Sequence, residues 1–548
     1  MMLLYSRSRR YVLLFLLLVA AGQASAQDPD ILLGRPTDHS ITASILFHDP
    51  MEHHIGFGTS PGAYSGTTPT ITNAPGTPDE VEINGLVPDM LYYYRVYYRP
   101  VGTQVFDSTA EHSFHTQRAP GSSFTFTVEA DEHLYDKKGV KNLYRITLAN
   151  EALDRPDFML SLGDIFGDDH EPFTITSGAL DTLHSNYRPL LGAITHSIPF
   201  YVCLGNHEGE NDYYLAQTPP NNLAVWGTEW RKFYYPNPYP NDFYSGNTDV
   251  EPWGIGNPEN YYAWTWGDAL FVVLDVYRDQ CDTSATPGSW NWSLGEPQYQ
   301  WLRSTLQAST AAHKFVFAHH VRGWGRGGIV PAHFYEWGGY AGNGVNYQFD
   351  QKRPGWDMPI QQLFETYGVD IFFQGHDHLF AHEELNGVVY QEVPMLIDST
   401  YKIRILANAD AYTADTIGGS GHLRVNVTPS CVTVDFVRSY LPAGTLDGVH
   451  HDGEVAFSYT LGDCAAAIKD EPERMAVTVF PNPANDRTMV RLPSRMSGAM
   501  ISVCDATGRT MIDTTRPLLE TATWMPGLYM VRVRKDDAVY TTRLVIAR

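Results

Sequence analysis

Clusters of side chains that bind metal ions follow short apolar runs at several places in this sequence. Asp and Asn supply oxygen ligands and His supplies imidazole nitrogen, a mixture that suits two divalent or mixed-valence transition-metal ions better than Ca or Mg alone. Two such ions about 3.5–4 Å apart are the arrangement that promotes displacements at phosphorus. The clusters are Asp131 with His133, Asp164, Asn206 with His207, His319 with His320, and His376 with His378.

The apolar run before each cluster is typical of a buried strand. Helical stretches at residues 140–153 and 180–194 separate the first three runs, which gives the strand–helix–strand order of an α/β domain. Open α/β sheets place their chemistry at the carboxyl ends of strands, so we expect the clusters to meet in one crevice. The runs are residues 124–128, 158–162, 198–204, 315–318 and 369–373.

Each cluster has a simpler explanation when it is considered alone. An Asp-x-His pair is usually a capped turn or a surface pair, and Gly205-Asn206-His207-Glu208 can be a solvated turn. A histidine after a strand, such as His376, is often a core residue with satisfied hydrogen bonds. The placement of every cluster directly after a buried strand favours one shared site.

The order of the motifs carries a family resemblance. The blocks are Asp131-x-His133, Gly163-Asp164, Gly205-Asn206-His207-Glu208, His319, and Gly375-His376-x-His378. Together they resemble the signature of the calcineurin-like metallophosphoesterase superfamily, over about residues 124–460. The resemblance implies an α/β four-layer sandwich of two β-sheets flanked by helices, and we assign residues 119–465 to this domain.

The same resemblance implies a dinuclear centre of Fe, Zn or Mn and a role for each residue. A metal-bridging hydroxide would attack phosphorus in line, while His207 would stabilise the transition state or protonate the leaving oxygen. Glu208 would orient His207. His319 is preferred to His320 as a ligand because it follows its strand directly. One ion would be held by Asp131, His133, Asp164 and His378, and the other by the bridging Asp164 with Asn206, His319 and His376.

These residues predict a phosphoesterase that hydrolyses phosphomonoesters. Substrate contacts are expected from Arg322, His320 and His382. Residues 209–262 are irregular and rich in Tyr and Trp, so we expect them to form an ordered wall or lid near the site. A phosphodiesterase or nucleotidase on the same fold is the alternative, and a non-catalytic surface-binding protein is a third reading.

The segment before this domain predicts a β-sandwich over residues 27–118, because short strand-like runs alternate with turn residues. Leu86, Pro88 and Tyr92 resemble the fibronectin type III signature, with Tyr92 at the position of a tyrosine corner. A sandwich in this place resembles the purple acid phosphatase branch. That branch has a metal-bound tyrosine where Gly167 stands here, so we expect no tyrosinate colour, and a preference for Fe(III) does not follow.

The last segment, residues 476–548, carries three short motifs beyond a charged linker at residues 466–475. They resemble the C-terminal sorting domain of type IX secretion substrates, which implies recognition by that machinery followed by release or attachment to the cell surface. An ordinary terminal β-sandwich that binds carbohydrate or protein is the alternative. The motifs are Pro481-Asn482-Pro483, Asp505-x-Thr507-Gly508-Arg509 and Gly527-Leu528-Tyr529.

Residues 1–26 have the pattern of a secretory signal peptide, with three arginines before an apolar run and an Ala-Ser-Ala site. Their removal takes the formal charge from −24 to −27, because no acid is lost with the arginines. Such acidity argues against a nucleic-acid-binding surface. No later run is long enough to span a membrane. Among five cysteines, Cys431 and Cys464 are a candidate bridge and Cys203 is expected in the core.

Overall fold

The computed structural model of the 548-residue chain separates into two compact units, Met1–Gly462 and Asp463–Arg548. The predicted signal peptide, the linker at residues 466–475, Cys281, Pro481 and residues 506–508 lie outside the described residues. Within the described part of the chain, no helix is both long and apolar enough to cross a membrane. The described residues are 28–135, 139–167, 172–280, 289–446, 449–464, 477–480, 482–492, 496, 498–505, 509–535 and 538–547.

The first strands form two antiparallel sheets that enclose their own core. Along β7 (Leu91–Pro100), Tyr92, Tyr94, Val96 and Tyr98 are buried while the residues between them are more exposed, the period-two pattern of a half-buried strand. The Tyr92 hydroxyl accepts a hydrogen bond from the Val87 N–H at 2.9 Å, which is the contact of a tyrosine corner. One sheet contains β1 (Asp30–Gly34), β2 (Ser40–Leu46) and β6 (Asp79–Asn84), and the other β3 (Met51–Gly58), β4 (Gly66–Thr67), β5 (Ile71–Thr72), β7, β8 (Asp107–Ser108) and β9 (His112–His115).

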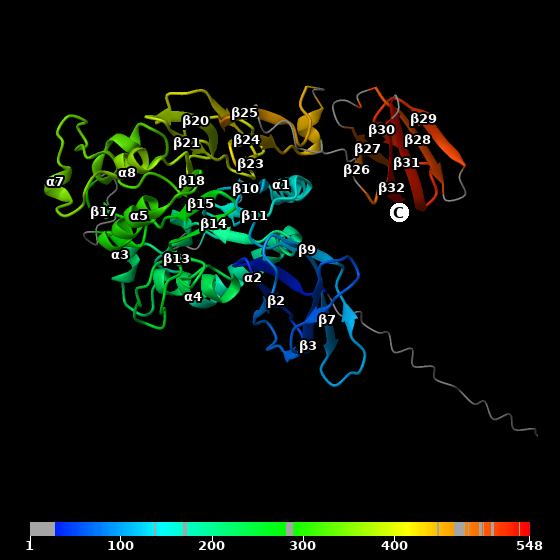
Figure 1. Cartoon of the computed structure of the whole chain (residues 1–548), viewed down its shortest axis with the longest axis horizontal. Coiled ribbons are helices and arrows are strands. Elements are labelled where there is room, and N and C mark those ends of the chain that lie inside the picture. The colour runs from blue at the N-terminus through cyan, green and yellow to red at the C-terminus, as the bar shows by residue number, and fades with distance from the viewer. Residues whose placement is uncertain are drawn as a thin grey trace, which may run out of the picture. The chain divides into compact units, whose positions relative to one another are not determined.

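Two larger mixed sheets follow, and they confirm the predicted α/β sandwich (Figure 1). In each sheet, the strands that precede the predicted ligand motifs pair with one another in parallel. The six-stranded sheet has the order β12 (Phe200–Val202), β11 (Phe158–Ser161), β10 (Phe124–Glu129), β23 (Gly421–Thr428), β24 (Cys431–Arg438), β25 (Val455–Gly462). The eight-stranded sheet has the order β13 (Ser245–Gly246), β14 (Tyr262–Trp266), β15 (Ala269–Val273), β18 (His313–Phe317), β19 (Ile371–Gln374), β21 (Val388–Glu392), β20 (Leu379–Leu385), β22 (Thr416–Gly418).

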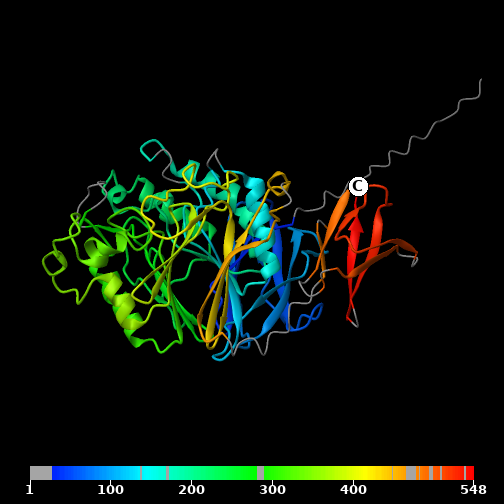
Figure 2. The ribbon, with the colours of Figure 1, turned by 90° about the horizontal axis from the view of Figure 1, so that it is seen from above.

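Helices cover the outer faces of the two sheets, as the ribbon seen from above shows (Figure 2). Thr176 caps the start of α2 (Ser177–Thr195), where its side chain accepts a hydrogen bond from the Ala179 N–H, and Gly368, with a left-handed φ of 66°, caps the end of α8 (Ile360–Tyr367). Helices α1 (Lys141–Asp154) and α2 (Ser177–Thr195) pack on the first sheet, and α5 (Glu296–Ala308) and α8 (Ile360–Tyr367) on the second. The shorter elements are α3 (Asp212–Leu215), α4 (Leu223–Tyr234), α6 (Tyr335–Gly338), α7 (Phe349–Lys352), β16 (Asp279–Gln280) and β17 (Trp292–Ser293).

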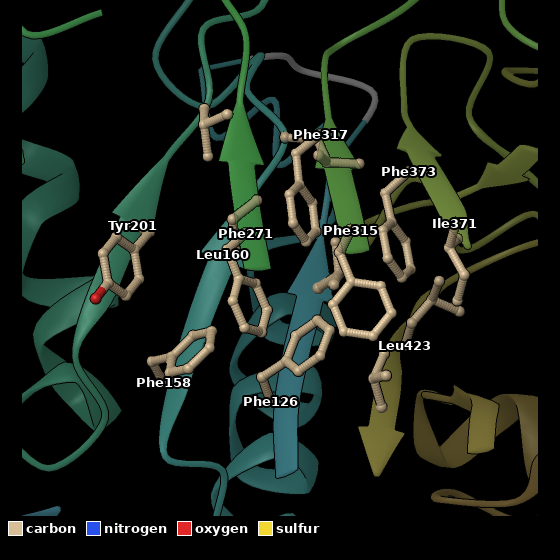
Figure 3. Packing of buried hydrophobic residues seen from close by; sticks show 14 of the residues in the cluster. Phe126, Phe158, Leu160, Tyr201, Phe271, Phe315, Phe317, Ile371, Phe373 and Leu423 are labelled. Carbon is tan, nitrogen blue, oxygen red and sulfur yellow. The ribbon is translucent and has the colours of Figure 1, made fainter. Parts of the chain in front are cut away.

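Aromatic side chains fill the space between the two sheets (Figure 3). In β10, Phe124, Phe126 and Val128 face the second sheet, whereas Thr127 and Glu129 face α1 and bond to its side chains. The Phe126 ring is fully buried, and its centroid lies 5.1 Å from that of Phe271. Edge-to-face and stacked ring pairs of this kind add to the free energy gained by burial.

Removal of the Phe126 ring is expected to destabilise this core strongly. The ring packs against five other phenylalanines, so Phe126→Ala leaves a cavity that rigid neighbours cannot fill. We expect the free energy of unfolding to fall by about 3–5 kcal/mol in urea denaturation. Val105→Ala, at a side chain that is 81% exposed, should change it by less than about 0.5 kcal/mol. Similar losses in the two variants would contradict this description of the core.

The N-terminal sandwich packs against helix α2 (Figure 1), and buried polar contacts add to the apolar packing of Leu32 and Leu46 there. Arg188 of α2 is buried, pairs with Asp30 at 3.0 Å and donates to the Ser44 carbonyl oxygen at 2.7 Å. At the end of α2, the rings of His112 and His196 lie with their centroids 4.2 Å apart. This interface therefore holds two neighbouring imidazoles that are stable together only while at least one is neutral.

Acid is expected to weaken this interface. Burial, followed by the neighbouring His196, lowers the pKa of His112 from 6.5 to about 4. The unfolded chain therefore binds more protons than the folded chain between about pH 6.5 and pH 4, and the free energy of unfolding falls as the pH falls. Between pH 7.5 and 4.5, the free energy of unfolding should fall less for His112→Gln than for the wild type. The difference should be about 1–2 kcal/mol, a value that allows for the partial exposure of His112. If urea denaturation shows the same fall in the free energy of unfolding for both proteins, His112 is not the group that makes the interface sensitive to acid.

The second unit is a small β-sandwich with its own core, which includes Ile501, Val503, Val531 and Val533. Alternate residues of β31 are buried, as in a strand with one solvated face. One sheet contains β26 (Thr478–Phe480), β27 (Arg487–Arg491) and β30 (Leu518–Glu520), and the other β28 (Met500–Asp505), β29 (Thr510–Thr514), β31 (Gly527–Lys535) and β32 (Ala538–Ile546).

The described cysteines agree with the sequence expectations. Cys431 and Cys464 are both disulfide-bonded. Cys203 is free and buried, and burial raises the pKa of its thiol well above the ordinary value. Cys203 is therefore an inert core residue rather than a reactive thiol.

Candidate metal centre

Strand pairing brings the predicted ligands to one edge of the two sheets. In the first sheet, Glu129, Ser161 and Val202 stand in register at the ends of β10, β11 and β12, so the loops that follow leave the sheet together. In the second sheet, β18 and β19 are parallel, and the Gly375 N–H donates to the His319 carbonyl oxygen at 2.8 Å. The carboxyl ends of five parallel strands therefore supply every predicted ligand.

The backbone is strained where the ligands stand. Five non-glycine ligands adopt left-handed φ angles, a conformation that costs of the order of 1 kcal/mol or more for most residues. Such strain persists only where surrounding contacts fix the chain, and it concentrates at functional sites. The residues are Asp131 (56°), His133 (39°), Asp164 (62°), His376 (77°) and His378 (62°).

The glycines of the motifs allow the loops to approach one another. A β-carbon at Gly205 would lie 2.3 Å from Asp164 Oδ1, and one at Gly163 would lie 2.2 Å from the Gly205 nitrogen. A β-carbon at Gly375 would lie 2.9 Å from Asp131 Oδ2. Each glycine therefore stands where any side chain would push a ligand carboxylate or its loop out of place.

The ligand atoms gather in two neighbouring groups, and a third set formed by His133, Asp164 and His207 connects them. In the first group, His378 Nε2 lies 3.5 Å from Asp131 Oδ1 and 3.1 Å from His133 Nε2. In the second group, which His376 completes, His319 Nε2 lies 3.1 Å from Asp164 Oδ2. The same Asp164 oxygen lies 3.8 Å from His133 Nε2, so this carboxylate faces both groups.

Unsatisfied buried atoms show that the cluster fits metal ions. Asp131 Oδ1, Asn206 Oδ1 and His319 Nε2 are enclosed and have no hydrogen-bond partner among the described residues. Buried polar atoms without partners are rare unless a bound ion or water satisfies them. Nε2 of His133 and Nε2 of His378 lie 3.1 Å apart, so either a hydrogen bond between them or a shared cation satisfies this pair. The donor set of Asp, Asn and His suits two transition-metal ions.

Hydrogen bonds on the far side of each ring fix the nitrogens that face the cluster. Nδ1 of His319 bonds to the Leu162 carbonyl oxygen at 2.8 Å, and Nδ1 of His378 bonds to that of Leu406 at 3.0 Å. A carbonyl can only accept, so Nδ1 carries the proton and Nε2 keeps its lone pair for a metal.

Charge in the cluster is arranged to attract cations. Burial alone would raise the pKa of Asp164, but His319 and His207 hold it well below the ordinary value. Burial opposes the protonation of His319, yet the neighbouring carboxylates of Asp164 and Asp131 raise its pKa to about 9. An environment that draws a proton onto a buried imidazole also favours a metal ion at the same nitrogen.

Glu208 fixes the loop that presents Asp164. The Glu208 carboxylate accepts backbone hydrogen bonds from Asp164 at 2.9 Å, Ile165 at 2.7 Å and Gly205 at 2.6 Å. The His207 N–H donates to Asp164 Oδ1 at 2.8 Å. We expect Glu208 to orient His207, and its described hydrogen bonds join the two ligand loops through their backbones.

The predicted substrate residues occupy different places. The His320 ring is buried beside His376, with centroids 4.5 Å apart, which puts it next to the cluster. The Tyr277 ring separates Arg322 from His320 and contacts both side chains. The described ring contacts of His382 are with Phe457 and Tyr459 of β25, rather than with the ligand histidines. The expected wall residues include Asn211, which is buried and bonds to Arg322.

Tyr135 belongs to the site although the sequence analysis did not select it. Its hydroxyl bonds to Nδ1 of His133 at 2.9 Å, and its ring fills the space above Gly167, where a β-carbon would lie 2.0 Å from the ring. Gly167 is the position at which the purple acid phosphatase branch has its tyrosine. The missing side chain at Gly167 was thus the available signal that another residue fills this space.

Asp164 should be the residue on which both metal positions depend. We expect the wild type to retain about two metal ions per chain and Asp164→Ala to retain fewer than one, because the variant lacks the carboxylate that faces both ligand groups. Metal content can be measured by mass spectrometry after dialysis. Asp242→Ala, at an exposed aspartate, serves as the control and should keep the wild-type content. Equal metal content in wild type and Asp164→Ala would refute a shared ligand.

Comparisons with known proteins agree with this geometry. Residues 124–380 match the family model of the calcineurin-like phosphoesterases, and residues 478–547 match that of the secretion system C-terminal sorting domain. The chain is similar in structure to PhoD, with 17% identity, a TM-score of 0.53, and coverage of 79% of this chain and 90% of that one. It is also similar to the purple acid phosphatase PPD1 from yellow lupin (Lupinus luteus) seeds, with 16% identity, a TM-score of 0.51, and coverage of 83% and 78%. No curated protein matches significantly.

Proposed function

Because residues 124–380 form a calcineurin-like phosphoesterase domain and residues 478–547 a type IX sorting domain, we propose that this protein is an exported, two-metal phosphatase that hydrolyses phosphomonoesters. The observation that supports it most is the pair of ligand groups that meet at Asp164. Asp131 Oδ1, Asn206 Oδ1 and His319 Nε2 are enclosed beside these groups without a hydrogen-bond partner among the described residues, and bound ions would satisfy them.

The residues named at the sequence level would hold the metals. Asp131, His133 and His378 would bind one ion, Asn206, His319 and His376 the other, and Asp164 would contact both. When bound, the ions act as Lewis acids on the phosphoryl oxygens and supply a nucleophile from water. We leave the metal identities among Fe, Zn and Mn open, since all three accept these donors.

His207 is placed to move a proton at the leaving oxygen. Its backbone is fixed through Asp164, while its side chain is 32% exposed, so the ring can reach a bound ester. His207 Nε2 lies 3.8 Å from Asp164 Oδ2. A protonated imidazole here would stabilise charge on the phosphoryl group and then donate its proton to the departing alkoxide.

The sorting tail indicates export, and we propose that the type IX machinery recognises it before release or surface attachment. In that setting the enzyme would meet phosphate esters outside the cell. A partly exposed histidine and a formal charge of −27 after removal of residues 1–26 are both compatible with small anionic substrates, because bound metal ions would dominate the local field.

Activity on two chromogenic esters tests the proposal. We expect metal-loaded protein to hydrolyse p-nitrophenyl phosphate faster than bis(p-nitrophenyl) phosphate. His207→Asn should lower kcat by about 10²–10⁴-fold, because it removes the proton donor, without changing the metal content. His451→Asn, at a side chain that is 75% exposed, should leave kcat unchanged.

Each other outcome has a defined meaning. Faster hydrolysis of the diester would establish the phosphodiesterase alternative. No hydrolysis of either ester by protein carrying about two metals per chain would refute a phosphoesterase and favour a surface-binding protein.

A further inference from the structure

A short hairpin follows the ligand His319 at the end of β18. Val321 and Arg326 pair across it, with the Val321 N–H donating to the Arg326 carbonyl oxygen at 3.1 Å. Gly323 and Gly325 have left-handed φ angles of 105° and 81°, which allow the tight turn. Arg322 is therefore held on a short, constrained segment that begins at the metal centre.

The guanidinium of Arg322 is fixed by two aromatic rings and one amide. Its Cζ lies 3.2 Å from the centroid of the Trp292 ring and 4.4 Å from that of Tyr277. Nη2 donates to Asn211 Oδ1 at 3.2 Å. Stacking on aromatic rings holds the planar group in one orientation but does not neutralise its charge.

This charge has no carboxylate partner in the described part of the chain. Three buried arginines elsewhere each pair with an acid: Arg188 with Asp30 at 3.0 Å, Arg231 with Glu210 at 2.6 Å, and Arg353 with Glu336 at 2.5 Å. Arg322 Nε is enclosed and has no hydrogen-bond partner. Burial lowers the pKa of Arg322 to about 10, so the group still carries its charge at neutral pH. A cation enclosed without an anion is costly unless a ligand supplies one.

The group lies beside the second metal position. The Tyr277 ring on which it stacks is 6.1 Å from the ring of His319, centroid to centroid. Asn211, which holds its Nη2, also donates to the carbonyl oxygen of Asn206 at 3.5 Å. Arg322 is thus connected to His319 through Tyr277 and to Asn206 through Asn211.

We infer that Arg322 is a preset anion-binding group that contacts a non-bridging oxygen of the substrate's phosphoryl group, and that it favours dianionic phosphomonoesters over monoanionic phosphodiesters. The inference rests on the proposed function, whose substrate class it specifies. A fixed positive charge attracts a dianion more strongly than a monoanion at the same distance. The planar fork of arginine can also bind two phosphate oxygens, which lysine cannot do.

The test compares the metal-loaded wild type with Arg322→Met and Arg322→Lys. Binding of inorganic phosphate is measured by calorimetry, and kcat/KM is measured for p-nitrophenyl phosphate and bis(p-nitrophenyl) phosphate. Met keeps most of the side-chain volume without charge, and Lys keeps the charge without the planar fork. Arg145→Met, at an exposed arginine of α1, removes the same charge away from the site and is the control. Metal content and thermal melting are recorded for each variant.

For Arg322→Met we expect phosphate binding at least about 10-fold weaker and kcat/KM for the monoester about 10²–10³-fold lower. The loss for the diester should be at least about 10-fold smaller, and metal content should not change. Arg322→Lys should recover part of the phosphate binding. If the Met variant is unstable, the comparison of Arg322→Lys with the wild type tests the anion site instead. Arg145→Met should resemble the wild type in every measurement.

Other outcomes separate the inference from the proposed function. Equal losses for the two esters would overturn the preference for dianions, and unchanged phosphate binding in both Arg322 variants would overturn the anion site itself. A wild type that binds phosphate through Arg322 but cleaves neither ester would support the anion site while refuting the phosphatase.

Discussion

Buried ligand atoms without hydrogen-bond partners, held at the edge shared by two sheets, are the constraint on which the catalytic domain depends. Asp131 Oδ1, Asn206 Oδ1 and His319 Nε2 have no hydrogen-bond partner among the described residues, and bound cations would satisfy all three in place. The strained φ angles of the ligand loops, the glycines that let them approach, and the backbone bonds to Glu208 all serve to keep these atoms together. Their arrangement would have little stability without the packed aromatic core behind it.

Environment divides the buried carboxyl groups of this domain into two classes. Asp131 and Asp164 face histidines, which hold their pKa values below the ordinary value although burial opposes this. Glu129 of β10 and Glu151 of α1 face one another on the side of β10 away from the second sheet, and burial raises the pKa of both. The two ligand aspartates therefore lie beside groups that favour their charged form, whereas burial favours the protonated form of the two glutamates.

Two side chains beside the metal ligands, His207 and Arg322, are held in ways that suit contact with a substrate. His207 is anchored by its backbone and open to solvent through its ring, which suits a group that must meet a leaving oxygen. Arg322 has its charge enclosed by Trp292 and Tyr277 and lacks a carboxylate partner in the described structure. In the proposed mechanism, His207 as proton donor and Arg322 as cation flank the ligands from different elements, and both are fixed before a substrate arrives.

The sequence by itself determined the ligand types, their order and the strands that carry them. Those properties are local: alternation in Phe124, Phe126 and Val128 sets the faces of β10, and each glycine-containing motif follows within a few residues of its strand. It also determined the export tail, whose short motifs need no partner elsewhere in the chain.

Only the tertiary structure decided which atoms meet. His133 and His378 are 245 residues apart, yet their Nε2 atoms lie 3.1 Å from each other. Tyr135 covers Gly167, and His382 packs on β25 rather than against the ligands. Neither contact could be predicted, because strand pairing and the direction of side chains in strained loops leave no periodic signal in the sequence.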